Sequence, residues 1–431
     1  MILFTRTGWL PPPLRFRRRV CLAAAAACLL AATWPAAAQS PTTAAREAVP
    51  VDGEPFAAAL ESLDGDWNAT LRAGDQRRVV AARDLVRWGE YRDTSTSTLI
   101  ILSDGGVLAA EVLALRDERL EAHSRLWGDV SLPVARVRGI VFDPPVDALR
   151  RDGLWGRILA AAGAHDQLWL DNGDVASGNV LGLRPPRGAA GDSSVVLSAQ
   201  GRELTMPVDQ LDALVFNPAL VDTAKPRESH AWVGFRDGSL LCVARIAPRD
   251  KLSEVQLPGA RPLTTATSRL WEAITYLRPA NERVEYLSNG KPAGFRHVPF
   301  LETEWPLAPD RSVAGGRLRA RGAIHDKGLG MHSTARAAYD LNGRYRRFAA
   351  QLAIDDAAGL GGSVTFRVFL DDAAGGWKQA YESPVIRGGA PPVPLSLDVT
   401  SARRLALIVD FADRGDTLDH ADWLDARLVR K

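Results

Sequence analysis

Residues 364–370 (VTFRVFL), 394–399 (PLSLDV) and 404–409 (RLALIV) decide the fold of the C-terminal third of the chain. The first two alternate apolar and polar side chains, which is the pattern of a strand with one buried face. The third is nearly all apolar, as expected of a central strand. Loops rich in Gly and Asp separate the three stretches. Together they predict two antiparallel sheets packed as a β-sandwich with long loops at its ends.

Three further sequence blocks lie around these strands, at 327–333 (KGLGMHS), 339–348 (YDLNGRYRRF) and 419–426 (DHADWLDA). Their order resembles the NPCBM family of carbohydrate-binding modules, which is associated with family 98 glycoside hydrolases, over residues 285–431. The resemblance implies a galactose-binding-like β-sandwich, a jelly-roll variant. It also implies a module of the kind appended to secreted glycosidases, binding sugars such as galactosides. No recognisable hydrolase domain accompanies it in this chain.

Sugar binding requires an aromatic ring for the apolar face of a pyranose and polar groups for the hydroxyls that lose water, because unpaired polar groups are costly. The C-terminal domain offers both kinds of side chain. The candidate carbohydrate-binding residues are Trp305, His332, Arg336, Asp355, Trp377 and Asp422. A hydrogen-bonded core histidine is the alternative interpretation of His332, and an edge-covering role that of Trp377. Trp423 falls in an alternating closing strand and is predicted to lie in the core.

Acidic residues in the same domain suit a hard cation, which takes several oxygen ligands. Asp356 and Asp419 are the candidate ligands of a structural Ca²⁺, an ion that galactose-binding-like folds often carry. A hydrogen-bonded loop network is the alternative. The sequence has no EF-hand spacing and no His/Cys cluster for zinc, so no cofactor beyond this Ca²⁺ is expected.

The middle of the chain contains an internal repeat with a period of roughly 65–75 residues. Each unit opens with an apolar strand that meets an Asp-Gly or Asn-Gly pair, at Asp104, Asn172 and Asp237, where a tight hairpin turn is favoured. Short alternating strands with such turns predict small antiparallel β-barrels, and the pattern resembles Sm-like or SH3-like barrels over about 95–280. The fold class is therefore all-β, with tandem barrels before the sandwich.

The N-terminus combines a cluster of arginines at 15–19, an apolar run at 20–34 and small residues before Gln39. This combination is typical of a secretory signal peptide cleaved near Ala38 and Gln39. An uncleaved membrane anchor, a lipoprotein cysteine at Cys28 and twin-arginine rather than Sec export stay open. After cleavage Cys242 is the only cysteine, lies in an apolar stretch and is predicted to be a core residue.

These features give the following predicted organisation: signal peptide at 1–38, linker at 39–55, partial β unit at 56–94, barrel repeat 1 at 95–147, a helix at about 148–163 and barrel repeat 2 within 148–224, barrel repeat 3 at 225–281, and the NPCBM-like domain at 285–431.

The sequence as a whole predicts a secreted or periplasmic protein that binds a glycan or polysaccharide and has no catalysis of its own. The net charge of +2 argues against nucleic acid and anionic membranes as partners. Two alternatives stay open. One is a structural adaptor of the cell envelope that binds proteins through the barrel repeats. The other is a cryptic glycoside hydrolase using Asp355, Asp356 or Asp422, although the chain has no G-x-S-x-G elbow and no phosphate-cradling loop.

Overall fold

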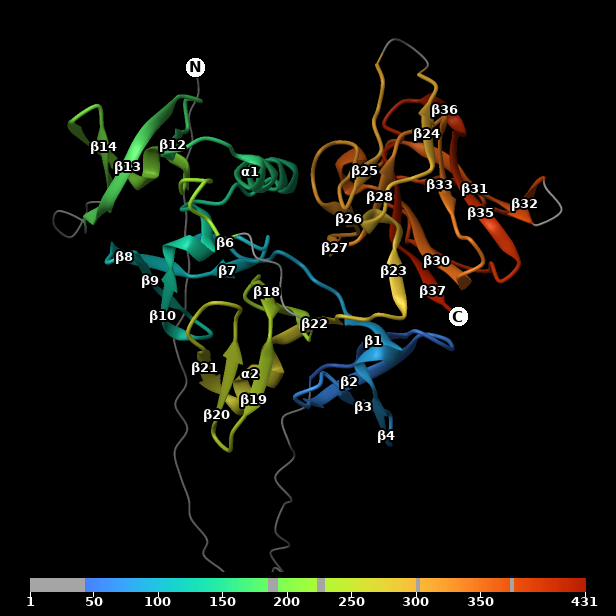
Figure 1. Ribbon diagram of the computed structural model, residues 1–431, viewed down its shortest axis with the longest axis horizontal. Coiled ribbons are helices and arrows are strands. Elements are labelled where there is room, and N and C mark those ends of the chain that lie inside the picture. The colour runs from blue at the N-terminus through green and yellow to red at the C-terminus, as the bar shows by residue number, and fades with distance from the viewer. Residues whose placement is uncertain (1–42, 185–192, 223–228, 300–302, 373–375) are drawn as a thin grey trace, which may run out of the picture. The chain divides into compact units, whose positions relative to one another are not determined.

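The computed structural model describes residues 43–184, 193–222, 229–299, 303–372 and 376–431 (Figure 1). The predicted signal peptide and its cleavage position lie outside these residues. The described chain is nearly all β, with antiparallel pairing throughout the named strands and the helices α1 (Ala148–Ala160) and α2 (Thr267–Ala273). Neither helix combines the length and the apolar character needed to cross a bilayer. The all-β fold class predicted from the sequence is confirmed.

Four β units share one plan between residues 46 and 279, in which the first strand pairs with both the second and the last. Unit A contains β1 (Arg46–Pro50), β2 (Phe56–Leu63), β3 (Ala69–Ala73), β4 (Gln76–Val80) and β5 (Leu85–Gly89). Unit B contains β6 (Leu99–Leu102), β7 (Val107–Ala109), β8 (Glu111–Arg116), β9 (Arg119–Ser124), β10 (Gly128–Pro133) and β11 (Val137–Val141). Unit C contains β12 (Asp166–Leu170), β13 (Val175–Arg184), β14 (Ser194–Ala199), β15 (Arg202–Pro207) and β16 (Leu211–Val215). Unit D contains β17 (Ala231–Phe235), β18 (Leu240–Val243), β19 (Arg245–Pro248), β20 (Leu252–Gln256), β21 (Leu263–Ala266) and β22 (Ile274–Pro279).

Unit A differs from its sequence prediction in one respect. Strand β1 lies inside the segment 39–55 that the sequence predicts to be a linker, and it makes unit A a full unit rather than a partial one. Ala48 and Val49 in this strand are buried, because β1 pairs with β2 on one side and β5 on the other. An Ala- and Thr-rich composition is typical of linkers, and here tertiary pairing overrides it.

The hairpin turns of units B, C and D follow the predicted turn chemistry. Gly105, Gly173 and Gly238 have φ values of 91°, 90° and 89°, which glycine adopts without strain. In each turn the preceding Asp or Asn accepts a hydrogen bond from the backbone N–H two residues on, at 2.9 Å in all three. The structural interpretation of these polar turn residues is confirmed. Helix α1, capped by Asp147, confirms the helix predicted between units B and C, and Cys242 is buried as predicted.

Strand pairing between units joins all four into one ladder. Strand β11 pairs with β16, β7 pairs with β18, and β22 pairs with β5. The order of units along the ladder is therefore C, B, D, A and not the order of the chain. One continuous hydrophobic core, which includes Trp67, Trp88 and Trp127, runs through the units.

The C-terminal domain contains two sheets (Figure 1). Sheet I has the strand order β25 (Ala308–Pro309), β28 (Gly328–Met331), β37 (Ala421–Arg430), β30 (Tyr345–Ile354) and β34 (Val393–Asp398), with β23 (Val284–Tyr286) also on β37. Sheet II has the order β24 (Gly294–His297), β29 (Ala335–Asp340), β35 (Ala402–Phe411), β31 (Ser363–Asp372) and β32 (Trp377–Glu382), with β33 (Ile386–Arg387) also on β31. A hairpin of β26 (Leu318–Ala320) and β27 (Ala323–His325), and the short β36 (Asp413–Asp416), complete the domain.

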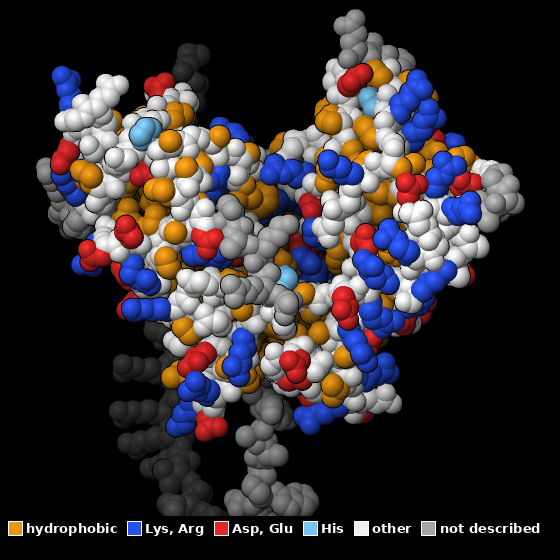
Figure 2. Space-filling model, in the orientation of Figure 1, with side chains coloured by type: hydrophobic (Ala, Val, Ile, Leu, Met, Phe, Trp, Pro, Cys, Tyr) orange, Lys and Arg blue, Asp and Glu red, His pale blue; other side chains and the backbone are white. Residues whose placement is uncertain are grey.

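The core of this sandwich lies between the two sheets and confirms the strands predicted from alternation. Phe366 of β31 and Trp423 of β37 are fully buried and meet edge to face with ring centroids 5.0 Å apart. The prediction that Trp423 is a core residue is confirmed. On the face of the molecule shown in Figure 2, basic and acidic side chains are interspersed, as the small net charge of +2 leads one to expect.

Candidate functional site

The structure places the residues predicted to bind sugar or metal in three separate environments of the sandwich. Trp305, His332 and Asp419 lie at the end where β24, β28 and β36 meet their loops. Asp355, Asp356 and Asp422 lie beside the hairpin β26–β27. Arg336 and Trp377 lie on the outer face of sheet II. The six candidate sugar-binding residues and the two candidate Ca²⁺ ligands are thus divided among three groups, and their roles stay predictions.

The first group is an aromatic cluster built from four segments of the domain. Trp305 stacks on His332 with ring centroids 4.8 Å apart and an interplanar angle of 5°. His420 lies 5.9 Å from Trp305, and His297 meets His332 edge to face at 5.7 Å. The Nδ1 atom of His297 also accepts a hydrogen bond from the Trp305 backbone N–H at 3.2 Å. The tryptophan ring is therefore fixed from one side by histidines, while it remains partly exposed to solvent.

Two histidines of this aromatic cluster, His332 and His420, have lowered pKa values, which favours their neutral form. Burial, together with the neighbouring His420 and His297, lowers the pKa of His332 to about 4, and burial lowers the pKa of His420 as well. His332 is 4% exposed, and its Nδ1 makes no hydrogen bond of ordinary geometry with the described residues; the same holds for Nδ1 of His420. A buried polar atom without a partner is uncommon in native proteins and marks a functional position more often than a random one. His332 thus belongs to the support of the exposed Trp305 ring rather than to the surface itself.

Asp419 closes the same end of the sandwich. Its side chain is fully buried, and Oδ1 accepts a hydrogen bond from the Ser363 backbone N–H at 2.8 Å, which anchors the start of β31. Burial raises the pKa of Asp419 to about 6. Its second oxygen makes no hydrogen bond of ordinary geometry with the described residues, and the side chain of Ser333 is its polar neighbour.

The second group is a set of enclosed carboxyls with structural contacts. Asp355 is 2% exposed and accepts backbone N–H groups of Ala357 and Arg319, each at 2.9 Å. Asp356 accepts the N–H groups of Arg321 and Gly322 at 2.8 and 2.7 Å, which fastens the turn of the hairpin β26–β27.

Asp422 is fully buried next to Asp355. Its oxygens make no hydrogen bond of ordinary geometry, and burial and the charge of Asp355 raise its pKa well above the ordinary value. A shift in this direction favours the protonated, uncharged form of the carboxyl. Asp355 and Asp422 are therefore shut away from any sugar in this structure.

The acidic residues are also the candidate ligands of a bound cation. Across the described ranges, no group of three or more His, Cys, Asp or Glu side chains is arranged to hold an ion. Asp356 uses both oxygens for backbone N–H groups, and Asp419 uses one. Ca²⁺ takes six to eight oxygen ligands, and the Ca²⁺ site predicted at Asp356 and Asp419 stays a prediction.

The third group lies on an open groove across sheet II. Arg336, Trp377 and Phe369 are among its lining side chains, and its volume is about 460 Å³. Trp377 is 42% exposed, and the guanidinium of Arg404 lies over its ring at 4.9 Å from the centroid. This groove is distinct from the aromatic cluster, because neither Trp305 nor His332 lines it.

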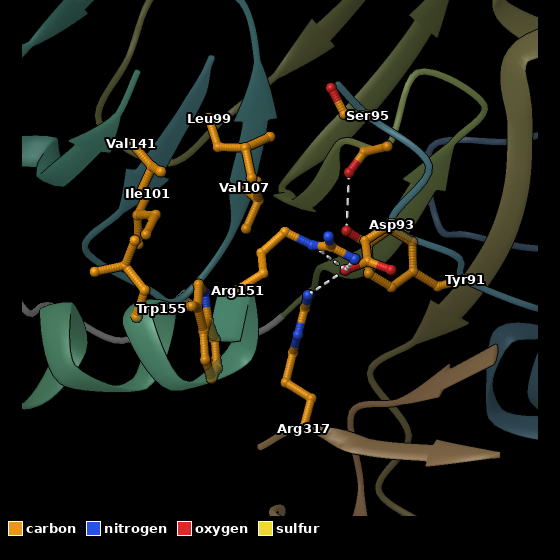
Figure 3. A pocket seen from close by; sticks show the side chains of 12 residues that line it. Tyr91, Asp93, Ser95, Leu99, Ile101, Val107, Val141, Arg151, Trp155 and Arg317 are labelled. Carbon is orange, nitrogen blue, oxygen red and sulfur yellow. Dashed lines mark hydrogen bonds and ion pairs between the residues drawn. The ribbon is translucent and has the colours of Figure 1, made fainter. Parts of the chain in front are cut away.

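A small cavity outside these three groups is lined by a buried ion-pair network around Asp93. Asp93 pairs with Arg151, Arg317 and Arg319 at N–O distances of 2.7 to 2.8 Å, and Figure 3 shows the guanidiniums of Arg151 and Arg317 converging on it beside Trp155. Although burial opposes ionisation, the three arginines hold the pKa of Asp93 well below its usual range. The cavity volume is about 20 Å³, room for about one water molecule, so it is not a site for a sugar.

The family of the C-terminal domain follows from a comparison with family models. The model described as "NPCBM/NEW2 domain" matches residues 286–429. Residues 286–429 form an NPCBM domain. The match begins in β23 and ends in β37, two strands of sheet I that pair with each other. The resemblance seen in the three sequence blocks is therefore confirmed by the family model.

Curated and solved proteins are similar to this chain over parts of their length. A protein from Renibacterium salmoninarum that is named as a candidate endo-alpha-N-acetylgalactosaminidase is 28% identical over 115 residues, which is 27% of this chain and 7% of that protein. The structure of CBM51 from Clostridium perfringens GH95 in complex with methyl-galactose is 22% identical and covers 34% of this chain and 99% of its own, with a TM-score of 0.30. The structure of CBM51-2 in complex with GlcNAc and INT domains from Clostridium perfringens ZmpB is 24% identical, covers 46% of this chain and 38% of its own, and has a TM-score of 0.30.

Sequence reasoning misses three residues of the NPCBM domain that share these environments. His297 and His420 complete the aromatic cluster, and Arg296 lies in the groove beside Arg336. His420 stands inside the block 419–426, so its place next to His332 could have been suspected from the pairing of 328–331 with 421–424. Strand β24, which carries His297 and Arg296, is four residues long and follows a Pro-Ala-Gly turn. Its alternation is too short to be recognised.

Proposed function

We propose that this protein binds a neutral glycan at the end of the NPCBM domain where Trp305 is displayed. NPCBM domains are carbohydrate-binding modules, and the single observation that carries the proposal is the stack of Trp305 on a neutral, buried His332. A ring that is fixed in advance loses little conformational freedom on binding, so more of the contact energy becomes affinity. The partly exposed Trp305 then serves as the platform on which the apolar face of a pyranose packs.

The proposal includes no catalysis by this chain. Hydrolysis of a glycosidic bond requires two carboxyl groups facing each other across an accessible cleft. Asp355 and Asp422 are buried, and Asp355 and Asp356 are engaged by backbone N–H groups. These contacts support a binding role and disfavour the hydrolase alternative. An exported location, which the N-terminal sequence predicts, is part of the same proposal.

The test uses the full chain on a glycan array and in affinity gels, beginning with methyl-galactose and N-acetylglucosamine. Trp305→Ala is expected to weaken retention at least about tenfold, since loss of one aromatic contact is worth about 1.4 kcal/mol or more. Trp377→Ala is the matched control, because it removes a more exposed tryptophan of the same domain. Absence of retention by every neutral glycan, or equal loss in both variants, would contradict the proposal and favour a protein partner.

A further inference from the structure

The outer face of sheet II carries two arginines, Arg296 and Arg336, that have no acidic partner in the part of the chain that the structure describes. The other charged residues in the same cross-strand row, Arg367 and Glu382, form ion pairs. Arg296 of β24 and Arg336 of β29 stand directly opposite each other in the strand pairing, and both are exposed. Neither forms an ion pair or a side-chain hydrogen bond with any residue that the structure describes. Like charges directly opposite on neighbouring strands are destabilising. The free domain therefore holds an uncompensated positive pair at a fixed place.

The remaining arginines of this face are neutralised by contrast. Arg367 of β31 pairs with Asp410 at 3.1 Å, and Arg404 of β35 pairs with Asp371. The absence of a partner is thus confined to Arg296 and Arg336 and is not a general property of the surface.

The register of the strands places an apolar platform beside this pair. Two residues along from the arginines, a distance of roughly 7 Å, the cross-strand row reads Gly294, Ala338, Ala406 and Phe369. The three small side chains leave the floor of the groove flat, and Phe369 lines it. Trp377 lies three strands across the sheet from Arg336 and, in the row of Asp340, four residues along it, a separation of roughly 20 Å, which an oligosaccharide of several rings can span.

We propose that this groove is a second binding site, specific for a polysaccharide that carries carboxylate groups, that is, one built from uronic acids. The planar fork of each guanidinium matches a carboxylate in two parallel hydrogen bonds. The floor and Trp377 accept the apolar faces of the sugar rings, which an acidic peptide lacks. This site is separate from the proposed neutral-glycan site, because none of its lining residues belongs to the aromatic cluster.

The experiment measures retention of the full chain by immobilised polygalacturonate, with dextran as the neutral control. Arg296→Ala/Arg336→Ala is expected to lower affinity at least tenfold, and Trp377→Ala several-fold, with a steep loss of wild-type binding as salt rises. Arg403→Ala is the matched control, an exposed arginine of β35 that alternation turns to the opposite side from Arg404. Trp305→Ala is expected to leave polygalacturonate binding intact, which separates this site from the neutral-glycan site.

Three outcomes would overturn the assignment. Unchanged retention in the double arginine variant, with a cooperative melting transition like that of the wild type, would remove the role of the pair. Equal loss in Arg403→Ala would show non-specific charge attraction. Binding of dextran sulfate or polyglutamate at the same strength as polygalacturonate would rule out a uronic-acid site.

Discussion

The aromatic cluster and the groove on sheet II belong to one domain and contain similar residue types, yet their physical surroundings are opposite. In the cluster, His332 is buried, neutral and stacked against Trp305. In the groove, Arg336 is exposed, charged and without a partner, and the exposed Trp377 has an arginine over its ring. Under the two proposals, the same ingredients, a ring and a polar group, serve neutral sugars at one place and acidic sugars at the other.

The largest expected effect is on the stability of the cluster. His332→Ala removes a buried ring from beneath Trp305 and is expected to lower the free energy of unfolding by about 2–4 kcal/mol, as large-to-small core changes do. Trp377→Ala, on the open face, is expected to cost less than about 1 kcal/mol. Urea unfolding of the two variants measures the difference. Equal costs would mean that the cluster is not an enclosed structure.

An effect of similar size concerns pH. The pKa of His332 is lowered to about 4 in the folded chain, so folding favours the neutral ring. Its contribution to stability is present above the ordinary histidine pKa of about 6.5 and is lost as the pH falls toward 4, by about 3 kcal/mol. Burial raises the pKa of Asp419 to about 6, so its contribution to stability changes with pH in the opposite direction. That contribution is present at low pH and is lost as the pH rises through about 6.

Melting temperatures between pH 4 and 7 separate these two contributions. Both contributions change between about pH 4 and 6, with opposite signs, so the variants separate them: His332→Phe is expected to make stability fall more steeply as the pH rises through this range, and Asp419→Asn is expected to make it rise more steeply. An unchanged slope in His332→Phe would show that the pKa of His332 is the same in the folded and unfolded chain. Neutral-glycan binding is expected to weaken over the same acid range.

The enclosed carboxyl pair gives the next effect. Burial and Asp355 raise the pKa of Asp422 well above normal, so its contribution to stability is present at acid pH and lost as the pH rises. Asp422→Asn keeps the shape without the titrating group and is expected to raise the free energy of unfolding at pH 8 by about 1 kcal/mol. Denaturant unfolding at pH 5 and pH 8 compares the wild type with Asp422→Asn. A larger gain in the free energy of unfolding at pH 5 than at pH 8 would contradict the raised pKa of Asp422.

The smallest effect is on the groove in the absence of ligand. Arg336→Ala relieves the repulsion across β24 and β29 and is expected to stabilise the domain by about 0.3 kcal/mol. Arg403→Ala is expected to leave the melting temperature unchanged. Destabilisation by Arg336→Ala would indicate that the two guanidiniums are compensated after all.

The sequence predicts the strands and turns of this protein well and the grouping of its site residues poorly, for a physical reason. Alternation at 364–370 and the Asp-Gly and Asn-Gly pairs report local backbone preferences, which the structure keeps. Which side chains meet depends on strand register and on loops, and neither is local. Arg336 was grouped with His332 from composition, although alternation along β29 and the short strand β24 place it beside Arg296 on the outer face. Strand β1 was hidden for the same reason, because only its pairing with β2 and β5 reveals it.

The ladder order of the four units has a consequence for biosynthesis. Strand β5 of unit A pairs at Trp88 with Leu277 of β22, about 190 residues later in the chain. At translation rates of about 5–20 residues per second, this partner emerges on the order of 10–40 s after β5. During that interval the first unit presents an unpaired strand edge, which is the kind of surface that other chains can join. A factor that shields nascent segments, or export before folding begins, would protect the chain until its last unit arrives.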